Sequence, residues 1–220
     1  MFRRTTRPVA LYFPVRAKFF YDNPATTGNL TQQKSWDSTK GGYSNPLQAS
    51  NSNSVSTQYN ASGGPILTTD ALGVQTQFVY GAVGGFTDLY VTQIKRAYGS
   101  SVQLTETREY DFNTGVVTRV TDVDNNVSTS TSYDVFGRPT LVKTAESKPE
   151  ETRIRIEYAD SLRRIITRAD LNIAGDEKLV SIKHFDQLGR VTGELVVRYV
   201  DNADGRKLRF FKSNGEHING

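Results

Sequence analysis

Few residues in this chain have the chemistry for catalysis or metal binding. The 220 residues include 2 His and 0 Cys, with His184 directly before Phe185 and His217 close to the C-terminus. Two histidines without cysteine cannot complete a closed zinc site unless carboxylates contribute. The sequence contains neither a nucleophile elbow nor a glycine-rich phosphate loop. The residue types therefore predict a protein that is not an enzyme and has no cofactor and no metal site.

One acidic stretch begins like a calcium loop. Asp122, Asp124 and Asn126 place oxygen donors at the first, third and fifth positions. An EF-hand also requires glycine at the sixth position and glutamate at the twelfth, where this chain has Val127 and Tyr133. We interpret this stretch as a turn, and give the same interpretation to residues 201–205.

The charge of the chain does not favour a nucleic-acid partner. The formal net charge is +4, from 27 Lys and Arg against 23 Asp and Glu, and the charges are dispersed. The densest basic cluster has acids interspersed, whereas nucleic-acid binders concentrate basic residues on one face. The cluster predicts a solvated strand face and contains Arg153, Arg155, Arg163, Arg164 and Arg168.

Aspartate and asparagine recur three residues before glycine. A type I turn favours Asp or Asn at its first position, where the side chain accepts backbone N–H groups, and Gly at its fourth, where φ is often positive. The spacing therefore predicts hairpin turns that begin at Asn60, Asp70, Asp134, Asn172, Asp186 and Asn202.

An aromatic residue precedes several of these turns and makes them members of one repeat. The aromatic ring can cover the strand end and stack on the next hairpin, and an arginine after the glycine can lie over the ring. A degenerate copy covers Tyr59–Gly63. The four clearer copies are Tyr21, Asp22 and Gly28; Tyr110, Asp111 and Gly115; Tyr133, Asp134, Gly137 and Arg138; and Phe185, Asp186, Gly189 and Arg190.

The segments between the turns alternate apolar or β-branched residues with polar ones. The alternation covers residues 126–133, 153–158 and 191–199, and a period of two is typical of a strand with one buried face. Hairpins in series stabilise one another, whereas one hairpin alone does not. We therefore predict an all-β fold, in which antiparallel β-hairpins in series form a curved, spiralling sheet. A short helix near residues 161–171 is the alternative for one segment.

We expect an N-terminal segment at residues 1–20, a repeat region at 21–205 and a C-terminal tail at 206–220. Within the repeat region, residues 45–64 are rich in Ser, Asn, Gln and Gly. They predict a polar connection or two weak strands around a turn. The chain has neither an apolar run of membrane-spanning length nor a signal-peptide pattern.

The repeat resembles that of the RHS/YD-repeat family, in which Tyr-Asp-x-x-Gly-Arg precedes an apolar strand. Residues 133–139 and 185–191 match closely, and residues 110–116 and 21–30 match with insertions. The resemblance covers about residues 20–205. It implies a secreted or cell-surface location and a β-sheet shell that can enclose a toxin domain. The chain is shorter than a closed shell and lacks the family's self-cleavage core motif, so the resemblance implies a fragment of such a shell.

We therefore predict a structural shell or interaction surface within a larger, toxin-related protein. The expected partners are the rest of that protein or neighbouring repeats, and glycans or an enclosed toxin domain are further candidates. The alternative function is a carbohydrate-binding or cell-contact module in which exposed tyrosines and Trp36 stack on sugars. Unpaired strand edges also predict self-association of the isolated chain.

Overall fold

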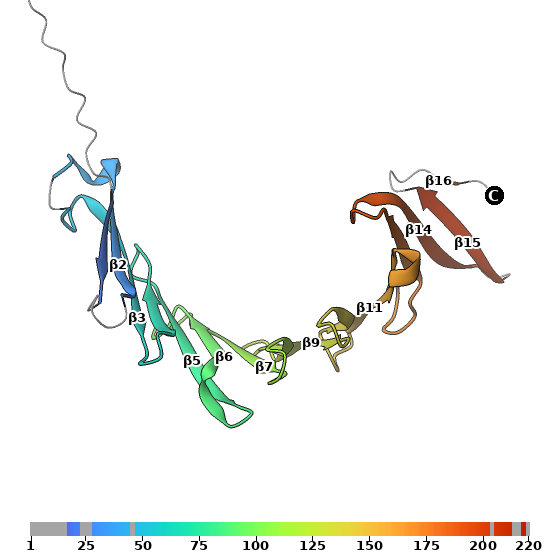
Figure 1. The fold of residues 1–220 in the computed structure, drawn as a ribbon, viewed down its shortest axis with the longest axis horizontal. Helices are drawn as coiled ribbons and strands as arrows, with labels where there is room; N and C mark the ends of the chain where they lie inside the picture. The colour runs from blue at the N-terminus through green and yellow to red at the C-terminus, as the bar shows by residue number, and fades with distance from the viewer. Residues whose placement is uncertain (1–16, 23–27, 45–46, 203–204, 213–216, 219–220) are drawn as a thin grey trace, which may run out of the picture. The chain divides into compact units, whose positions relative to one another are not determined.

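The computed structural model describes residues 17–22, 28–44, 47–202, 205–212 and 217–218. Its described strands form one antiparallel sheet in which strand order follows chain order from β1 to β16. This arrangement confirms the predicted all-β class and the hairpins in series (Figure 1). The chain divides into two compact units, of which the first runs to Val79 and includes Lys95–Gln103, and the second contains Tyr80–Ile94 and everything from Leu104 onward.

The first unit is made of short polar strands. The 3-10 turn η1 (Ser38–Lys40) follows β2, and Asp37 caps it by accepting the amide of Thr39. The polar stretch that we expected around residues 45–64 contains strand β3, whose exposed residues are Val55 and Gln58 and which pairs with β2 and β4. The strands are β1 (Ala17–Tyr21), β2 (Leu30–Trp36), β3 (Ser52–Tyr59), β4 (Pro65–Thr69) and the start of β5 (Gln75–Val83).

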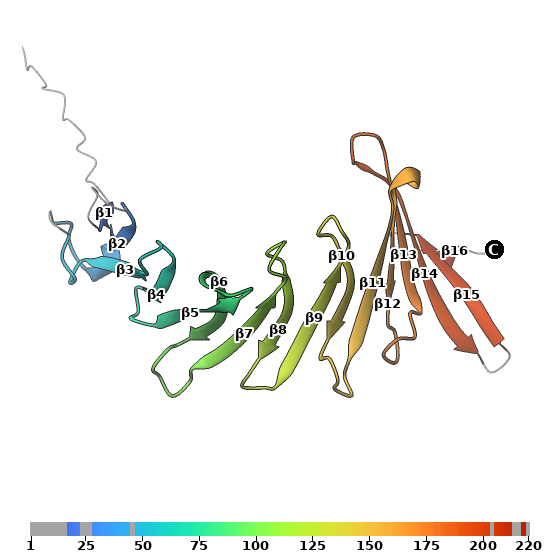
Figure 2. The same cartoon turned by 60° about the horizontal axis from the view of Figure 1, so that its bottom comes forward.

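The second unit holds most of the repeats. Its strands lie side by side in chain order (Figure 2). They are the end of β5, β6 (Phe86–Arg96) up to Ile94, β7 (Leu104–Tyr110), β8 (Val117–Asp122), β9 (Val127–Tyr133), β10 (Pro139–Thr144), β11 (Thr152–Ala159), β12 (Arg164–Ala169), β13 (Leu179–Phe185), β14 (Val191–Asn202), β15 (Gly205–Lys212) and β16 (His217–Ile218).

The predicted strands at residues 126–133, 153–158 and 191–199 are confirmed by β9, β11 and β14. The alternative of a helix near 161–171 is wrong. Only Asp160–Leu162 form a single 3-10 turn, η2, and Arg164–Ala169 form β12 between β11 and β13. The β-branched residues of β12 fit a pleated surface, and their ladder with two strands outweighs the helical spacing of the apolar positions.

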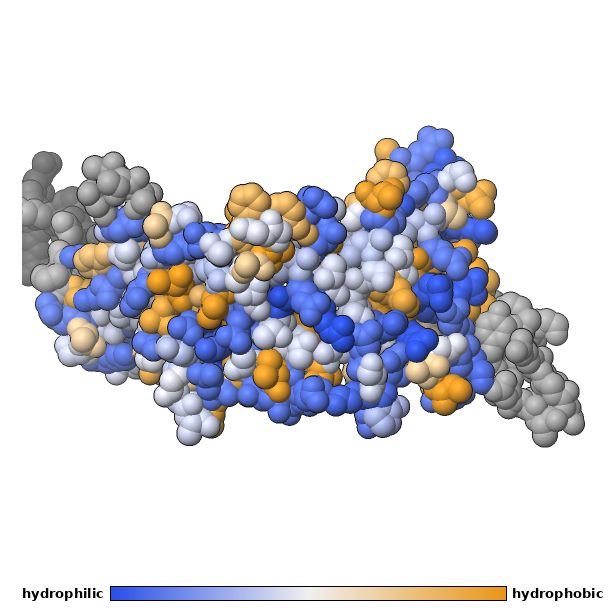
Figure 3. Space-filling view, turned by 90° about the horizontal axis from the view of Figure 1, so that it is seen from below, coloured by the Kyte–Doolittle hydropathy of each residue, from blue (hydrophilic) through white to orange (hydrophobic). Residues whose placement is uncertain are grey.

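Burial is slight on both faces of the sheet. The described hydrophobic core residues are Leu47, Ile94, Ile166, Val180 and Val197, and the last three form one cluster across β12, β13 and β14. On the face that Figure 3 shows, hydrophobic residues occur as separate patches among mainly hydrophilic ones. The described helices are single 3-10 turns, so none of them has the length or the apolar character that a membrane crossing requires.

Candidate functional site

The turn after β9 shows how each repeat reverses the chain. The backbone closes twice, with Asp134 N donating to Arg138 O at 2.9 Å and Gly137 N donating to Asp134 O at 3.0 Å. The Asp134 carboxylate also accepts the amides of Phe136 and Arg138, both at 2.9 Å. Gly137 has a φ of 74°, which is the left-handed conformation that glycine adopts without strain. The side chain and the glycine thus fix one tight turn.

Other turns repeat this arrangement. The turns at Asn60, Asp70 and Asp186 have the same pair of backbone bonds and a glycine of positive φ. The turn at Asp111 is one residue longer, and its carboxylate accepts the amides of Asn113 and Thr114. At the first copy, Asp22 bonds to both the backbone and the side-chain amide of Asn29, with Gly28 also at positive φ, and part of that loop lies outside the described residues.

The loop that contains Asn172 differs from its prediction. Asp170 and Asp176, rather than Asn172, hold it together by accepting backbone amides from Leu171 to Glu177. Gly175 has positive φ as the spacing indicates. Two longer-range carboxylates replace the local Asn side chain here, because the loop is too wide for a single capping residue. The predicted turn at Asn202 continues into residues outside the described ranges.

Sequence reasoning missed one turn of the series, between β11 and β12. Asp160 O accepts the amide of Arg163 at 3.0 Å, and Arg163 has a φ of 48° where other turns place glycine. Tyr158 is the next-to-last residue of β11, two residues before Asp160, whereas in the other motifs the aromatic residue is the last of its strand. The available signal was this aromatic–acid pair, but an inserted Ala159 and the missing glycine obscured it.

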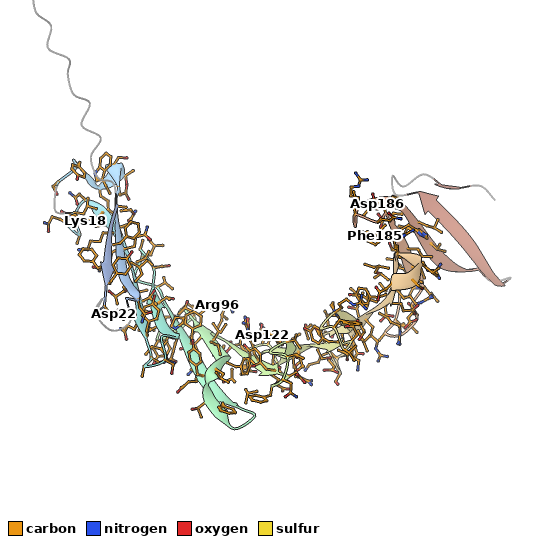
Figure 4. All side chains as sticks on the ribbon, in the orientation of Figure 1. Lys18, Asp22, Arg96, Asp122, Phe185 and Asp186 are labelled. Atoms are coloured by element: carbon orange, nitrogen blue, oxygen red, sulfur yellow. The ribbon has the colours of Figure 1, made fainter. Side chains whose placement is uncertain are left out.

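The aromatic residues of the motif mark a local shift in strand register. The pairing shifts next to Tyr21, Tyr59, Tyr110 and Phe185, and on the partner strand after Pro139, which faces Tyr133. Such a bulge bends a strand and re-aims a side chain. Each motif thus places its ring at the end of a strand and next to a turn, and Phe185 and Asp186 lie together in this way at the end of β13 (Figure 4).

Four tyrosine hydroxyls bond across to the hairpin before their own. Tyr133 Oη donates to Val117 O at 2.7 Å, and Val117 is the residue that faces Tyr110. Tyr158 Oη donates in the same way to Pro139 O at 3.1 Å, and Pro139 faces Tyr133. These bonds form a series from one repeat to the next, which we call the tyrosine ladder.

The tyrosine ladder extends beyond these two steps in both units. In the first unit, Tyr59 Oη donates to Leu30 O at 2.9 Å, and Leu30 faces Tyr21. In the second unit, Tyr110 Oη donates to Val91 O at 2.8 Å, and its ring stacks on Tyr90 with centroids 4.8 Å apart. Phe185 has no hydroxyl and ends the series, beside an open apolar cavity of about 430 Å³.

Arg138 joins two successive turns. Its Nε donates to Asp134 at 2.7 Å within its own turn, and its outer nitrogens donate to both carboxylate oxygens of Asp160 at 2.8 and 3.1 Å. The guanidinium also lies 4.1 Å from the centroid of the Tyr158 ring. Arg190 repeats the first of these contacts, with Nε 2.6 Å from Asp186.

These contacts favour the charged forms of the turn residues. The Arg138 side chain lowers the pKa of Asp160, and the amide and side chain of Arg190 lower the pKa of Asp186. For Asp134, desolvation raises the pKa, but the amide and guanidinium of Arg138 outweigh it, so the pKa lies below its usual value. The carboxylates of these three turns are thus held as charged hydrogen-bond acceptors.

The basic cluster on the strands forms ion pairs along the sheet. Arg155 pairs with Glu177 at 2.7 Å, Arg153 with Glu151 at 2.6 Å, and Arg168 with Glu157 at 3.3 Å. These pairs are at least partly exposed, so each contributes little to stability. The acids beside these arginines reduce the positive charge that the cluster could offer to a nucleic-acid backbone.

A second open hollow is a groove of about 470 Å³ over β8 and β9, whose walls include Glu109, Arg119 and Ser130. His184 lies exposed on β13, away from this groove. Within the described part of the chain, acids and histidines nowhere form a group of three that could hold a metal ion.

Trp36 is half-buried and already engaged. Its Nε1 donates to Gly41 O at 3.2 Å, and its ring meets the edge of Tyr43 with centroids 6.0 Å apart. The ring is therefore partly covered, and its stacking on a sugar stays a prediction.

Comparison with solved structures identifies this arrangement of strands in a known protein. The chain shares its fold with part of TcdB2-TccC3. The matched structure is the crystal structure of TcdB2-TccC3 without its hypervariable C-terminal region, with a TM-score of 0.56 and 15% sequence identity. The match covers 87% of this chain but only 11% of that chain. No family profile and no curated protein matches the sequence.

Proposed function

We propose that this chain is a YD-repeat segment, which serves as a structural wall or interaction surface of a larger protein. The tyrosine ladder carries the proposal, because it uses the motif tyrosines to join each hairpin to the one before it. The motif resembles the YD repeat, and the fold likeness to part of TcdB2-TccC3 covers most of the chain. In this proposal the aromatic, acidic and glycine residues of the motif maintain the wall and perform no reaction.

Two observations support a non-enzymatic role. The turn acids are engaged with backbone amides and arginines, so they hold their charge. The groove over β8 and β9 is open, and two acids in its lining, Asp111 and Asp134, are already engaged with backbone amides, whereas a catalytic site needs titratable groups that are available to a substrate. Because the motif resembles the YD repeat of secreted and cell-surface proteins, we propose a secreted or cell-surface location, and surface labelling of intact producing cells tests it.

An in-frame deletion tests whether the chain is a repeat strip. Removing residues 111–133 joins Tyr110 directly to Asp134 and takes out one aromatic-to-aromatic unit. A strip held by nearest-neighbour contacts remains folded after such a loss. We expect a β-rich circular dichroism spectrum and a cooperative thermal transition for this variant.

The matched control is a shorter deletion, of residues 111–122. It removes β8 and the turn before it but keeps β9, so every later strand enters the sheet with reversed direction. We expect this smaller deletion to unfold the chain or abolish its cooperative transition. The repeat interpretation is wrong if the longer deletion is the more damaging one.

The alternative function is a carbohydrate-binding or cell-contact module. The open polar groove over β8 and β9 favours it, because serine and threonine hydroxyls and the Tyr133 side chain line its wall. Binding of the intact chain to a glycan array, lost on Ser130→Trp, would support this function. An array with no signal above background would exclude it.

A further inference from the structure

The turns on one edge of the second unit carry exposed apolar side chains at their tips. These side chains, which we call the tip row, retain between 37% and 92% of their accessible surface. They belong to successive turns after β7, β9, β11 and β13, which lie on the same edge of the unit (Figure 2). The tip row consists of Phe112, Val135, Phe136, Leu162 and Leu188.

The turns close without these side chains, although Phe112 stacks on Phe86 with centroids 5.4 Å apart and the Arg138 guanidinium lies 5.1 Å from the Phe136 ring centroid. The turns close through the acid, the glycine or Arg163, and backbone amides, as described above. Polar residues suit an exposed turn position, since they are satisfied by water. Phe136, Leu162 and Leu188 nevertheless occupy the same third position of three successive turns. Single exposed apolar residues are ordinary, but recurrence at equivalent positions indicates a surface that another molecule covers.

The spacing of the tip row restricts its occupant. Successive tips on one edge are two strands apart, which is about 10 Å in a β-sheet. A partner that contacts every tip must therefore carry apolar groups with the same period. A second copy of this chain has the same period, because its turns have the same spacing.

Charge also favours an apolar contact between like surfaces. Asp134 and Asp160 are bonded to Arg138, and Asp186 is bonded to Arg190, so the acids beside the tips are already neutralised. The row therefore has no strong excess charge to attract an anionic membrane or an acidic peptide. Its apolar groups are what remains for recognition.

We infer that the tip row is a self-complementary interface through which two copies of this chain dimerise. A two-fold axis reverses the row, so that the 134–137 turn of one copy faces the 160–163 turn of the other. Five exposed side chains of this size cover roughly 600 Å² per partner, of the same order as the ~800 Å² per partner of stable interfaces. This interface is distinct from the predicted association through strand edges and does not depend on the proposed wall function.

Sedimentation velocity of the full chain over a wide concentration range tests the inference. The test variant carries Phe136→Ser, Leu162→Ser and Leu188→Ser. The matched control carries Val123→Ser and Ile173→Ser, which are exposed apolar residues in turns of the opposite edge. We expect the unchanged chain and the control to dimerise with the same affinity, and the test variant to dimerise at least tenfold more weakly. A monomeric unchanged chain, or a test variant that associates as tightly as the control, overturns the inference.

Cross-linking places the contact independently of affinity. Because the chain has no cysteine, Phe136→Cys and Leu162→Cys chains can be mixed and treated with a short bis-maleimide. We expect a covalent heterodimer, and much less product when Phe136→Cys is mixed with Ile173→Cys. Equal yields from both mixtures would contradict the two-fold contact. That result would not bear on the repeat interpretation, which the deletion of residues 111–133 tests separately.

Discussion

At the residue scale, the tyrosine hydroxyl is the smallest group that connects one repeat to the next. Tyr133→Phe removes the donor to Val117 O and leaves the ring in place. We expect the free energy of unfolding to fall by about 1 kcal/mol, because the half-buried carbonyl loses its partner. Urea titration measures the change. Tyr98→Phe, at an exposed tyrosine outside the ladder, is the control, and an equal effect at both positions would contradict the ladder.

Gly137 tests the turn itself. An added Cβ would meet no atom within 4 Å, so the positive φ of 74° is the only obstacle to a side chain. Gly137→Ala should cost about 1–2 kcal/mol of stability through backbone strain alone. Gly193 in β14 also has open space around it but no positive φ.

The matched change Gly193→Ala should therefore leave the thermal midpoint unchanged or slightly raised, since alanine restricts the unfolded chain. Equal losses at both glycines would argue that space, not backbone conformation, decides the effect. Gly137→Val, with its branched side chain, should be at least as harmful as Gly137→Ala.

Residue types predicted the turns better than they predicted the contacts between turns. The Asp134 turn follows from a local preference that four consecutive residues satisfy. The bond from Tyr133 to Val117 depends on strand register, which the turn motif alone does not specify. Arg163 was missed because left-handed conformation is rare for arginine, and the surrounding ladder between β11 and β12 enforces it.

At the element scale, Arg138 ties the turn after β9 to the turn after β11. The pKa values of Asp134 and Asp160 lie below their usual values in the folded chain. A carboxyl with a depressed folded-state pKa stabilises the fold above its unfolded pKa of about 3.9, and this stability is lost as the pH falls through the folded pKa. We expect the thermal midpoint to drop as the pH falls below about 4.

Arg138→Gln should weaken this acid dependence, because two carboxyls lose the guanidinium that favours their charged form. Arg190→Gln is the matched control, since Arg190 pairs with Asp186 alone among the described contacts. Thermal melts from neutral to acidic pH should show a smaller fall of the thermal midpoint below about pH 4 for Arg138→Gln than for Arg190→Gln. An equal fall for the two variants would contradict the bridging role of Arg138.

The segment from Asp160 to Ala169 shows why element type can be ambiguous. Leu162, Ile165, Ile166 and Ala169 have helical spacing, yet Ile165 and Ile166 pair with strands on both sides. The local spacing of apolar residues does not include the pairing with β11 and β13, because the residues of those strands lie outside the segment. The β-branched residues and the flanking strands were the better guide.

At the scale of the whole molecule, the order of the sheet follows the order of the chain. Each described strand pairs with its neighbours in sequence, so the serial hairpin pattern was sufficient to predict the topology. The pairing of hairpins in sequence needs only short loops, which the Asp–Gly turns supply. The buried cluster of Ile166, Val180 and Val197 could not be located in advance, since it depends on which residues face each other across three strands.

Nearest-neighbour pairing also predicts that a destabilising substitution loosens only the strands around it. Val180 is buried with Ile166 and Val197, and Val180→Ala should cost ~1–3 kcal/mol by removing apolar contacts. In a quasi-one-dimensional sheet, hydrogen exchange should speed up in β12–β14 and remain unchanged in β7–β9. The converse change, Val120→Ala in β8, should speed up hydrogen exchange in β7–β9 and leave it unchanged in β12–β14. Hydrogen exchange read by mass spectrometry separates these regions, and a uniform loss of protection from either variant would mean that the second unit unfolds as one globular domain.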